Sequence, residues 1–227
     1  MNTIVSGLDR ITRSKECIVE ICDDGPHVIG GVIENYAYGG VVLEQELTNV
    51  LLVDTTDVNS PIPFSDAVYL PLVFPFKYGN GGAEIVYSID EELKINVVHV
   101  CEFRKEDVSS HFDQSHILGR KFKMRPLRYA ERRILHSSIR QRSPRDQRLM
   151  DKMLNGHCWK ISGLLSHTKG CCQFKCADGE SCSVWNFAEL SLNKAVIGDI
   201  WHDFSGSTLC FGMCHKCKLI HGYIGCD

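Results

Sequence analysis

Cysteine and histidine side chains concentrate near the C-terminal end of this sequence, at spacings that suit metal binding. Nine of the twelve cysteines and five of the ten histidines lie between His157 and Cys226. Thiolate and imidazole groups two to four residues apart can converge on one tetrahedral zinc ion, because short turns keep them within ligand distance. These residues predict a zinc-stapled module over residues 157–227, with Zn2+ as its cofactor.

The densest part of this module predicts one zinc site, and a looser cluster predicts a second. The first site draws its ligands from Cys210, Cys214, Cys217, His221 and Cys226. The second site uses three further cysteines, Cys172, Cys176 and Cys182. Its fourth ligand is either His167 or Cys158. A surplus of sulfur ligands favours a structural site, in which protein atoms fill all four positions. Two alternatives stay open: buried thiols without metal, and disulfides.

Charge divides the chain into blocks. Residues 1–119 carry 7 Lys and Arg against 19 Asp and Glu, a net charge of −12. Residues 120–152 carry 12 Lys and Arg against 3 Asp and Glu, a net charge of +9. Residues 153–227 carry 6 Lys and Arg against 6 Asp and Glu, so they are neutral. An acidic block and a basic block in one chain indicate separate surfaces with separate partners.

The basic block suits the neutralisation of phosphate groups, which predicts contact with nucleic acid. Phe122 and Tyr129 are available to stack on bases. The predicted binding residues are Arg120, Lys121, Lys123, Arg125, Arg128, Arg132, Arg133, Arg140, Arg142, Arg145 and Arg148. Charge contacts do not distinguish RNA from DNA. The alternative is that the basic block docks on the acidic block of the same chain.

Two helices are predicted in the basic block. One begins after Pro126, with an apolar stripe that includes Leu127 and Ile134. The other has Ser143 as its cap and Pro144 at its first position, and it ends at Asn155-Gly156.

The acidic block predicts β-strands. Residues 17–34 predict two antiparallel strands around an Asp-Gly-Pro turn, and further strands are expected at 40–44, 50–53, 83–88 and 95–103. The prolines within residues 67–76 limit that segment to an edge strand. The predicted fold class is α+β: a β-rich N-terminal barrel or sandwich (1–115), a basic helical connector (116–156) and a small zinc-stapled C-terminal module (157–227).

Residues 16–53 resemble the first motif of Sm-like proteins. Gly25 and Gly30 have the glycine spacing of that motif after a hydrophobic strand. The sequence departs from the family where Sm proteins bind RNA, since Tyr36 replaces an Asp and Gly40 replaces an Asn. No Arg-Gly pair supplies the second motif. The resemblance therefore implies a barrel that serves as an interaction module.

The C-terminal part resembles, in degenerate form, the His-Me finger nucleases that include the His-Cys box endonucleases. Ser166-His167, the cysteines and then Asn193 follow the order of that family. The resemblance implies that His167 deprotonates a water molecule and that Asn193 holds a divalent metal. The Asn-Pro-x-His step is absent after Cys182, and alignment on Cys210 and His221 instead places the catalytic histidine at Thr208.

These features predict a zinc-binding, nucleic-acid-associated adaptor or regulatory protein without catalytic residues. The alternatives are a metal-dependent His-Me finger endonuclease and a protein-interaction factor that binds no nucleic acid. The predicted partners are RNA or DNA and a protein held by the N-terminal domain. No apolar run is long enough to cross a bilayer, and the charge at Asp9 comes too early for a secretory signal. We therefore expect an intracellular protein, nuclear or cytoplasmic, with no membrane contact.

Overall fold

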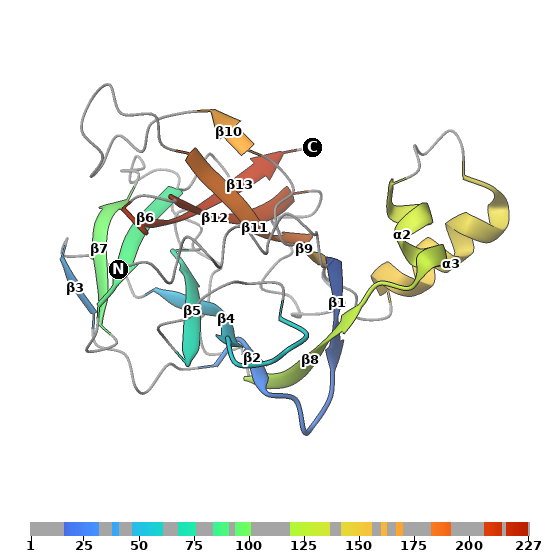
Figure 1. Cartoon of the computed structure of the whole chain (residues 1–227), viewed down its shortest axis with the longest axis horizontal. Coiled ribbons are helices and arrows are strands. Elements are labelled where there is room, and N and C mark those ends of the chain that lie inside the picture. Colours follow the sequence, from blue (N-terminus) through green and yellow to red (C-terminus); the bar gives the residue numbers. More distant parts are fainter. Residues whose placement is uncertain are drawn as a thin grey trace, which may run out of the picture.

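The computed structural model describes residues 16–31, 38–40, 47–60, 68–75, 84–90, 94–100, 119–136, 142–155, 160–162, 167–169, 183–191, 207–214 and 217–226. Within these ranges the chain is mostly β-strand, with two helices. The strands form two sheets, which we call sheet A and sheet B (Figure 1).

Sheet A joins strands from distant parts of the chain. Its spatial order is β5 (Tyr69–Phe74), β4 (Thr48–Asp54), β2 (His27–Ile29), β8 (Arg120–Pro126), β1 (Glu16–Ile21) and β9 (Lys160–Ser162). All its neighbouring strands are antiparallel. Among the described strands β5 lies at an edge of sheet A, which confirms the expectation drawn from its prolines.

The predicted hairpin over residues 17–34 is wrong, because β8 lies between β1 and β2. Phe122 pairs with Ile21 on one side and with His27 on the other. The link between β1 and β2 passes so close to β8 that a Cβ atom on Gly25 would lie 2.0 Å from the backbone oxygen of Phe122. Glycine is therefore required there by close packing of two backbones.

Sheet B combines N-terminal and C-terminal strands. Its order is β10 (His167–Lys169), β11 (Ser183–Ser191), β12 (Ser207–Cys214), β13 (Ile220–Cys226), β6 (Glu84–Ile89), β7 (Ile95–Val100) and β3 (Tyr38–Gly40). Its pairs are antiparallel except β3 with β7. The pairing of β13 with β6 joins the cysteine-rich segment to the acidic one.

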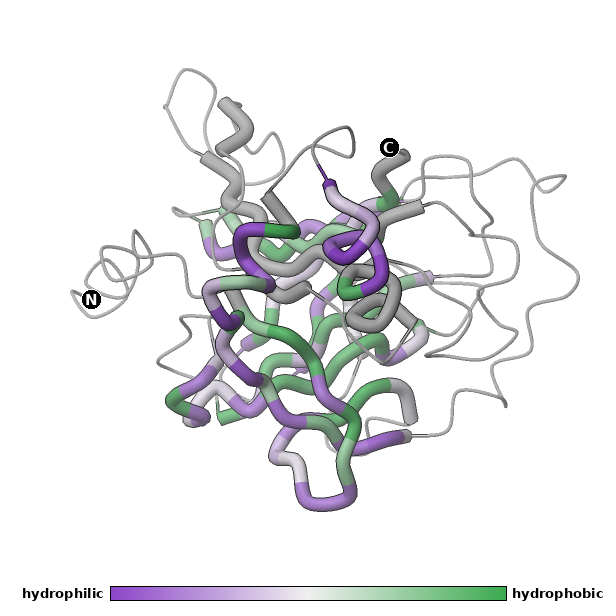
Figure 2. Tube along the Cα trace, turned by 90° about the vertical axis from the view of Figure 1, so that its right-hand side faces the viewer, coloured by the Kyte–Doolittle hydropathy of each residue, from purple (hydrophilic) through white to green (hydrophobic). Residues whose placement is uncertain are grey.

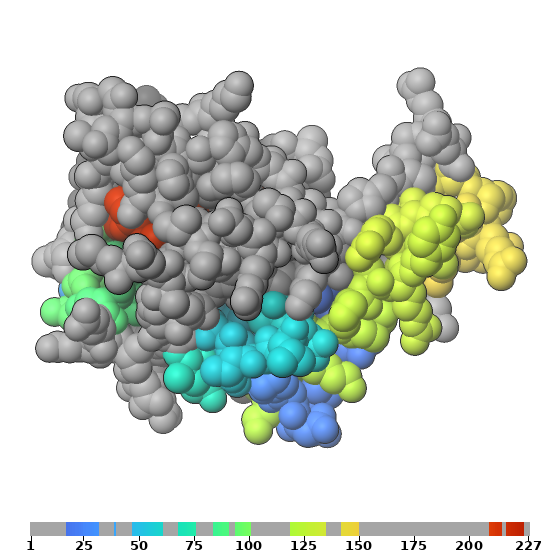
Figure 3. All heavy atoms as spheres, viewed as in Figure 1, coloured from blue at the N-terminus to red at the C-terminus, as the bar shows by residue number. Residues whose placement is uncertain are grey.

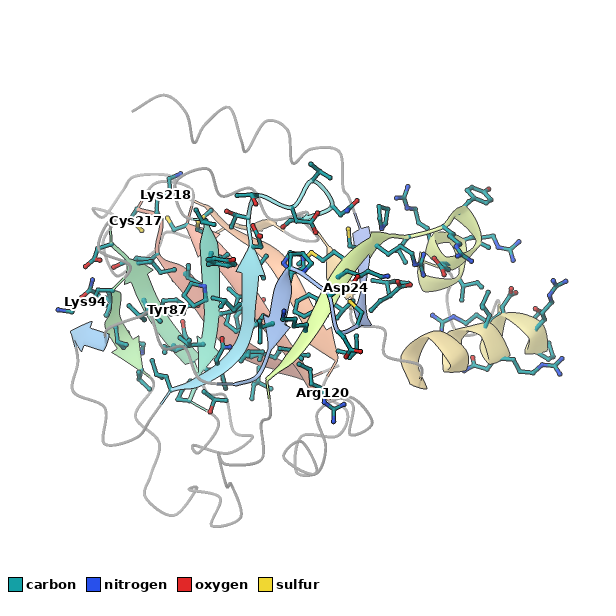
Figure 4. The ribbon with its side chains drawn as sticks, turned by 90° about the horizontal axis from the view of Figure 1, so that it is seen from below. Asp24, Tyr87, Lys94, Arg120, Cys217 and Lys218 are labelled. Atoms are coloured by element: carbon teal, nitrogen blue, oxygen red, sulfur yellow. The ribbon has the colours of Figure 1, made fainter. Side chains whose placement is uncertain are left out.

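One hydrophobic core lies between the two sheets. Its large buried side chains include Phe74 and Phe122 from sheet A, and Tyr87 and Phe211 from sheet B. The hydroxyl of Tyr87 donates to the backbone oxygen of Pro71 at 2.9 Å, which links the sheets directly (Figure 4). Figure 2 shows hydrophobic residues along the central strands and hydrophilic residues towards the turns.

Two helices follow β8 at one end of the molecule. They are α2 (Tyr129–His136) and α3 (Pro144–Asn155). The start of α3 is as predicted, whereas α2 begins later than expected, so that Leu127 lies before the helix. The Ser143 hydroxyl accepts a hydrogen bond from the amide of Asp146 at 3.1 Å, and Asp146 accepts one from the Ser143 amide. This capping box confirms the predicted start of α3. Figures 1 and 3 show both helices standing beyond the sheets.

The predicted fold class is therefore wrong. The supposed helical connector contains β8, which lies inside sheet A, and the supposed C-terminal module contributes β11, β12 and β13 to sheet B. Each described sheet has two open edges, so the described strands close no barrel. The physical reason is that strands at both ends of the chain bury their apolar faces in one shared core. The boundaries at residues 115 and 156 stay predictions, and the pairing of β13 with β6 spans both of them.

Neither of the described helices is long and apolar enough to cross a lipid bilayer.

Candidate functional site

A tight turn brings two of the predicted zinc ligands together. The turn joins β12 to β13, and the amide of Cys214 donates to the oxygen of Leu219 at 2.9 Å. The amide of Lys218 donates to the oxygen of Cys214 at 3.0 Å, and Lys218 has a φ of 60°. This left-handed residue directly after Cys217 lets the chain reverse within a few residues.

Cys214 and Cys217 share one small cluster on the outer side of sheet B. Cys214 is fully buried and Cys217 is half-buried, and both pack with Val86 and Leu219. A tetrahedral zinc site needs four ligands, so these two cysteines would supply half of one. Figure 4 shows Cys217 and Lys218 at the end of the molecule away from α2 and α3.

The remaining C-terminal ligands are spread along the hairpin. Cys210 and Cys214 lie on one strand, and four residues of extended chain separate them by about 13 Å. Cys226 ends β13 at the far side from the turn, about 20 Å along the strand from Ile220. One zinc ion therefore cannot bind all the ligands predicted for the first site.

His221 lies between these positions, because its pairing partner is Gly212. Its side chain is buried, and burial lowers the pKa of His221 to about 4. Its Nδ1 atom lies 3.9 Å from Glu84 Oε1. The imidazole is neutral at neutral pH, which is the form that binds metal.

Other predicted ligands lie outside the described residues or are described by backbone alone. Cys158, Cys172, Cys176 and Cys182 lie outside, and only the backbone of Cys226 is described. Among the described side chains, no three His, Cys, Asp and Glu residues are close enough to hold a metal ion. Zinc binding therefore stays a prediction.

The residues that carry the nuclease resemblance are likewise not brought together by described side chains. His167 lies in β10, where it pairs with Trp185, and Asn193 lies outside the described residues. The endonuclease alternative stays a prediction.

The basic residues of β8 follow the alternation of a strand with one buried face. Phe122 and Met124 point into the core, while Lys121 and Lys123 are exposed on the other face. Arg120 is exposed at the start of the strand (Figure 4). The expectation that Phe122 stacks on bases is wrong, because its ring is fully buried and packs 4.9 Å from the ring of His27.

The two helices and the residue before α2 carry most of the exposed arginines among the described residues. These are Arg128, Arg132, Arg133, Arg145 and Arg148. Arg142 is half-buried, and Arg140 lies outside the described residues. The described acidic side chains beside them already have basic partners: Asp146 bonds Arg133 at 3.0 Å and Glu131 bonds Arg125 at 2.9 Å.

Arg125 anchors α2 to sheet A. Its Nε donates to Glu20 at 2.6 Å, and both its terminal nitrogens donate to Glu131 at 2.9 Å. The hydrogen bonds from Arg125 lower the pKa of Glu131 below its ordinary value. Ile18 and Leu127, with Leu149 against them, form a small apolar cluster that attaches α3 to the same place.

His27 is a buried histidine that is not among the predicted site residues. His27 donates from Nε2 to Asp57 at 2.9 Å, and its Nδ1 accepts from the amide of Asp54 at 2.9 Å. The sequence feature that accompanies His27 is the pair of its partners, Asp54 and Asp57, which lie three residues apart. The contacts of His27 fix the loop after β4, so its role is structural.

Fold and surface together define a two-sheet, mostly antiparallel β protein with a projecting pair of basic helices. Comparison with family models, with curated protein sequences and with solved structures finds no match to this chain. The resemblances to Sm-like proteins and to His-Me finger nucleases therefore stay predictions.

Proposed function

We propose that this protein is a zinc-binding, nucleic-acid-associated adaptor without enzymatic activity. The observation that carries the proposal is the exposed basic surface formed by β8, α2 and α3. We define this basic surface by eight exposed residues: Arg120, Lys121, Lys123, Arg128, Arg132, Arg133, Arg145 and Arg148.

The position of the helices favours an external polyanion over internal pairing. Docking on the acidic segment of the same chain would require its carboxylates to meet the helix arginines. Glu20 of the acidic segment contacts Arg125 of β8 at 2.6 Å, at the root of α2. Both helices lie beyond the sheets (Figure 3), and Arg132, Arg133, Arg145 and Arg148 on them are exposed. Phosphate groups of a nucleic acid are the complementary partner.

Zinc supports this role by holding the far end of sheet B together. Cys214 and Cys217 supply two thiolates, and Cys172, Cys176 and Cys182 are the proposed source of the others. Cys182 directly precedes Ser183, and the next residue, Val184, pairs with Cys214.

An apolar patch next to β5 supports the proposed contact with a protein. Val58, Val68 and Tyr69 are 81%, 57% and 42% exposed, respectively. The amide of Thr55 donates to the oxygen of Val68 at 2.9 Å, which ties the loop after β4 to β5. Contiguous exposed apolar patches mark interaction surfaces, and we propose that these three side chains form one. We place the adaptor inside the cell, in the nucleus or cytoplasm, because zinc needs reduced thiolates.

Titration of binding against salt concentration tests the proposal. The full-length protein is expected to bind oligonucleotides with an affinity that falls steeply as salt rises. The triple variant Arg128→Gln, Arg145→Gln, Arg148→Gln should flatten the slope of log K against log salt by about 2 on single strands, since each phosphate contact contributes about 0.7. These three arginines are chosen because the Arg133–Asp146 pair then stays intact.

The matched control is Lys94→Gln, which removes a charge at the other end of the molecule (Figure 4). It should leave the slope unchanged. Equal slopes for the triple variant and the wild-type protein would remove the support for nucleic-acid binding by this surface.

A further inference from the structure

The most exposed large apolar side chain among the described residues lies at the start of α2, directly after Arg128 of the basic surface. Tyr129 is 85% exposed at the start of α2. Aromatic rings normally bury most of their area. An exposed ring on a positively charged helix therefore indicates a surface built for a ligand that carries both negative charge and flat apolar faces.

Helix geometry places this ring in line with two guanidinium groups. Residues three and four apart lie on the same side of a helix, so Tyr129, Arg132 and Arg133 form one stripe. All three are exposed, whereas Glu131 and Ile134, on the opposite side of α2, are buried. Arg128 adds a further exposed guanidinium directly before the ring.

The base of this stripe is held rigidly. The carboxylate of Glu131 accepts a hydrogen bond from the amide of Arg128 at 2.7 Å, which caps the start of α2. The same carboxylate is bound by Arg125 from β8. Tyr129 thus stands on a backbone fixed to sheet A, so binding through its ring need not first order the chain that carries it.

We propose that the stripe of Tyr129, Arg132 and Arg133 binds single-stranded nucleic acid, with the tyrosine ring stacked on an unpaired base. This inference rests on the proposed function and deepens it by naming the form of the ligand. Stacking on aromatic rings combined with basic side chains along the backbone is the general mode of single-strand binding. In a duplex the flat faces of the bases are covered by neighbouring base pairs, so only a single strand offers them to Tyr129.

The test uses full-length protein and labelled oligonucleotides of about 12 nucleotides, a length within the usual site size. Four ligands are compared: a single strand of thymidine, a single strand of uridine, a duplex, and an abasic strand of equal length. The wild-type protein is expected to prefer both base-bearing strands over the abasic strand and the duplex. Tyr129→Ala should weaken binding to those two strands by about 5- to 150-fold.

Salt dependence separates stacking from charge. Tyr129→Ala should lower the affinity at every salt concentration without changing the slope of log K against log salt, because no phosphate contact is lost. Binding of this variant to the abasic strand should equal that of the wild-type protein. Tyr129→Phe keeps the ring and should retain the affinity for base-bearing strands. Lys94→Gln, at the end of the molecule away from α2 and α3, is the control and should leave all four affinities unchanged.

The outcomes distinguish the two proposals. If the wild-type protein binds base-bearing and abasic strands equally, or if Tyr129→Ala binds as the wild-type protein does, the stacking inference is overturned while nucleic-acid binding stands. If Tyr129→Ala weakens binding to the duplex by the same factor as to the single strands, the preference for unpaired bases is wrong. If the wild-type protein binds none of the four ligands, the proposed function itself fails, and a protein partner becomes the better explanation for the exposed ring.

Discussion

The guanidinium of Arg125 and the carboxylate of Glu131 meet through two parallel hydrogen bonds. Nη1 donates to Oε2 and Nη2 donates to Oε1, each at 2.9 Å. This bidentate pair sets the angle at which α2 leaves β8. It also occupies one of the arginines predicted to bind nucleic acid, since Arg125 additionally donates to Glu20.

Glu131→Gln and Arg125→Gln are each expected to lower the free energy of unfolding by about 2 kcal/mol, because each leaves a charged partner without its hydrogen bonds. Chemical denaturation followed by circular dichroism measures the change. Asp24→Asn, at an exposed turn, is the control and should have little effect. Stability equal to wild type in both pair variants would mean that α2 does not depend on this contact.

The pair of Arg125 and Glu131 also predicts that the free energy of unfolding depends on pH. Hydrogen bonds from Arg125 hold the pKa of Glu131 below its ordinary value of 4.5. A carboxylate with a lowered folded pKa contributes stability above that ordinary value, and the contribution is lost as the pH falls through the folded pKa. The stability difference between wild type and Glu131→Gln should therefore be constant at neutral pH and shrink below about pH 4.5. A difference that stays constant down to acid unfolding would contradict this assignment.

His27 predicts a second pH dependence, in a different window. Burial lowers the pKa of His27 from its ordinary value of 6.5, although hydrogen bonding to Asp57 opposes the shift. Below about pH 6.5 His27 therefore binds a proton more readily in the unfolded chain than in the folded chain. The contribution of neutral His27 to the stability of the folded protein is thus present above about pH 6.5 and is lost as the pH falls. His27→Gln should be less stable at about pH 8, since the Asp54 amide loses its acceptor, and should lose less stability on acidification. Parallel stability curves for the two proteins would rule out His27 as the titrating group.

Gly25 should tolerate no side chain. A Cβ atom there would lie 2.0 Å from the backbone oxygen of Phe122, which cannot move without breaking the ladder of β8. Gly25→Ala is expected to cost at least about 3 kcal/mol, measured by thermal or chemical unfolding. Gly39→Ala is the matched control, because the nearest atom to its Cβ is the end of the flexible Lys94 side chain. Equal stability of the two variants would contradict the close approach of Gly25, in the link between β1 and β2, to the backbone of β8.

Metal analysis of the purified protein tests whether Cys214 and Cys217, at the turn between β12 and β13, bind zinc. Cys214→Ser and Cys217→Ser should each lower the zinc content per chain, and a chelator should lower the unfolding temperature of the wild-type protein. Cys22→Ser is the control, because Cys22 lies outside the cluster around Val86 and Leu219. Absence of bound zinc from protein purified under reducing conditions would contradict the proposed cofactor.

Local signals in the sequence predicted local structure well. The start of α3 follows from Ser143, Pro144 and Asp146, whose contacts span only three residues. Strands at β6 and β7 follow from runs of β-branched residues. The exposed arginines of α2 and α3 also follow from a helical pattern that leaves them opposite the apolar stripe. In each case the sequence signal that predicts the element lies within the element itself.

Pairing between distant segments was beyond what the sequence determined by itself. The alternation of Lys121, Phe122, Lys123, Met124 and Arg125 is typical of a strand, but its high charge suggested a connector. Only the tertiary structure decided that this strand lies between β1 and β2, and that the close cysteine spacings of residues 210–226 are stretched out along a hairpin. The physical reason is that a strand takes its partners from whichever segments bury their apolar faces in the same core, here Phe122 beside Ile21 across a hundred residues of chain.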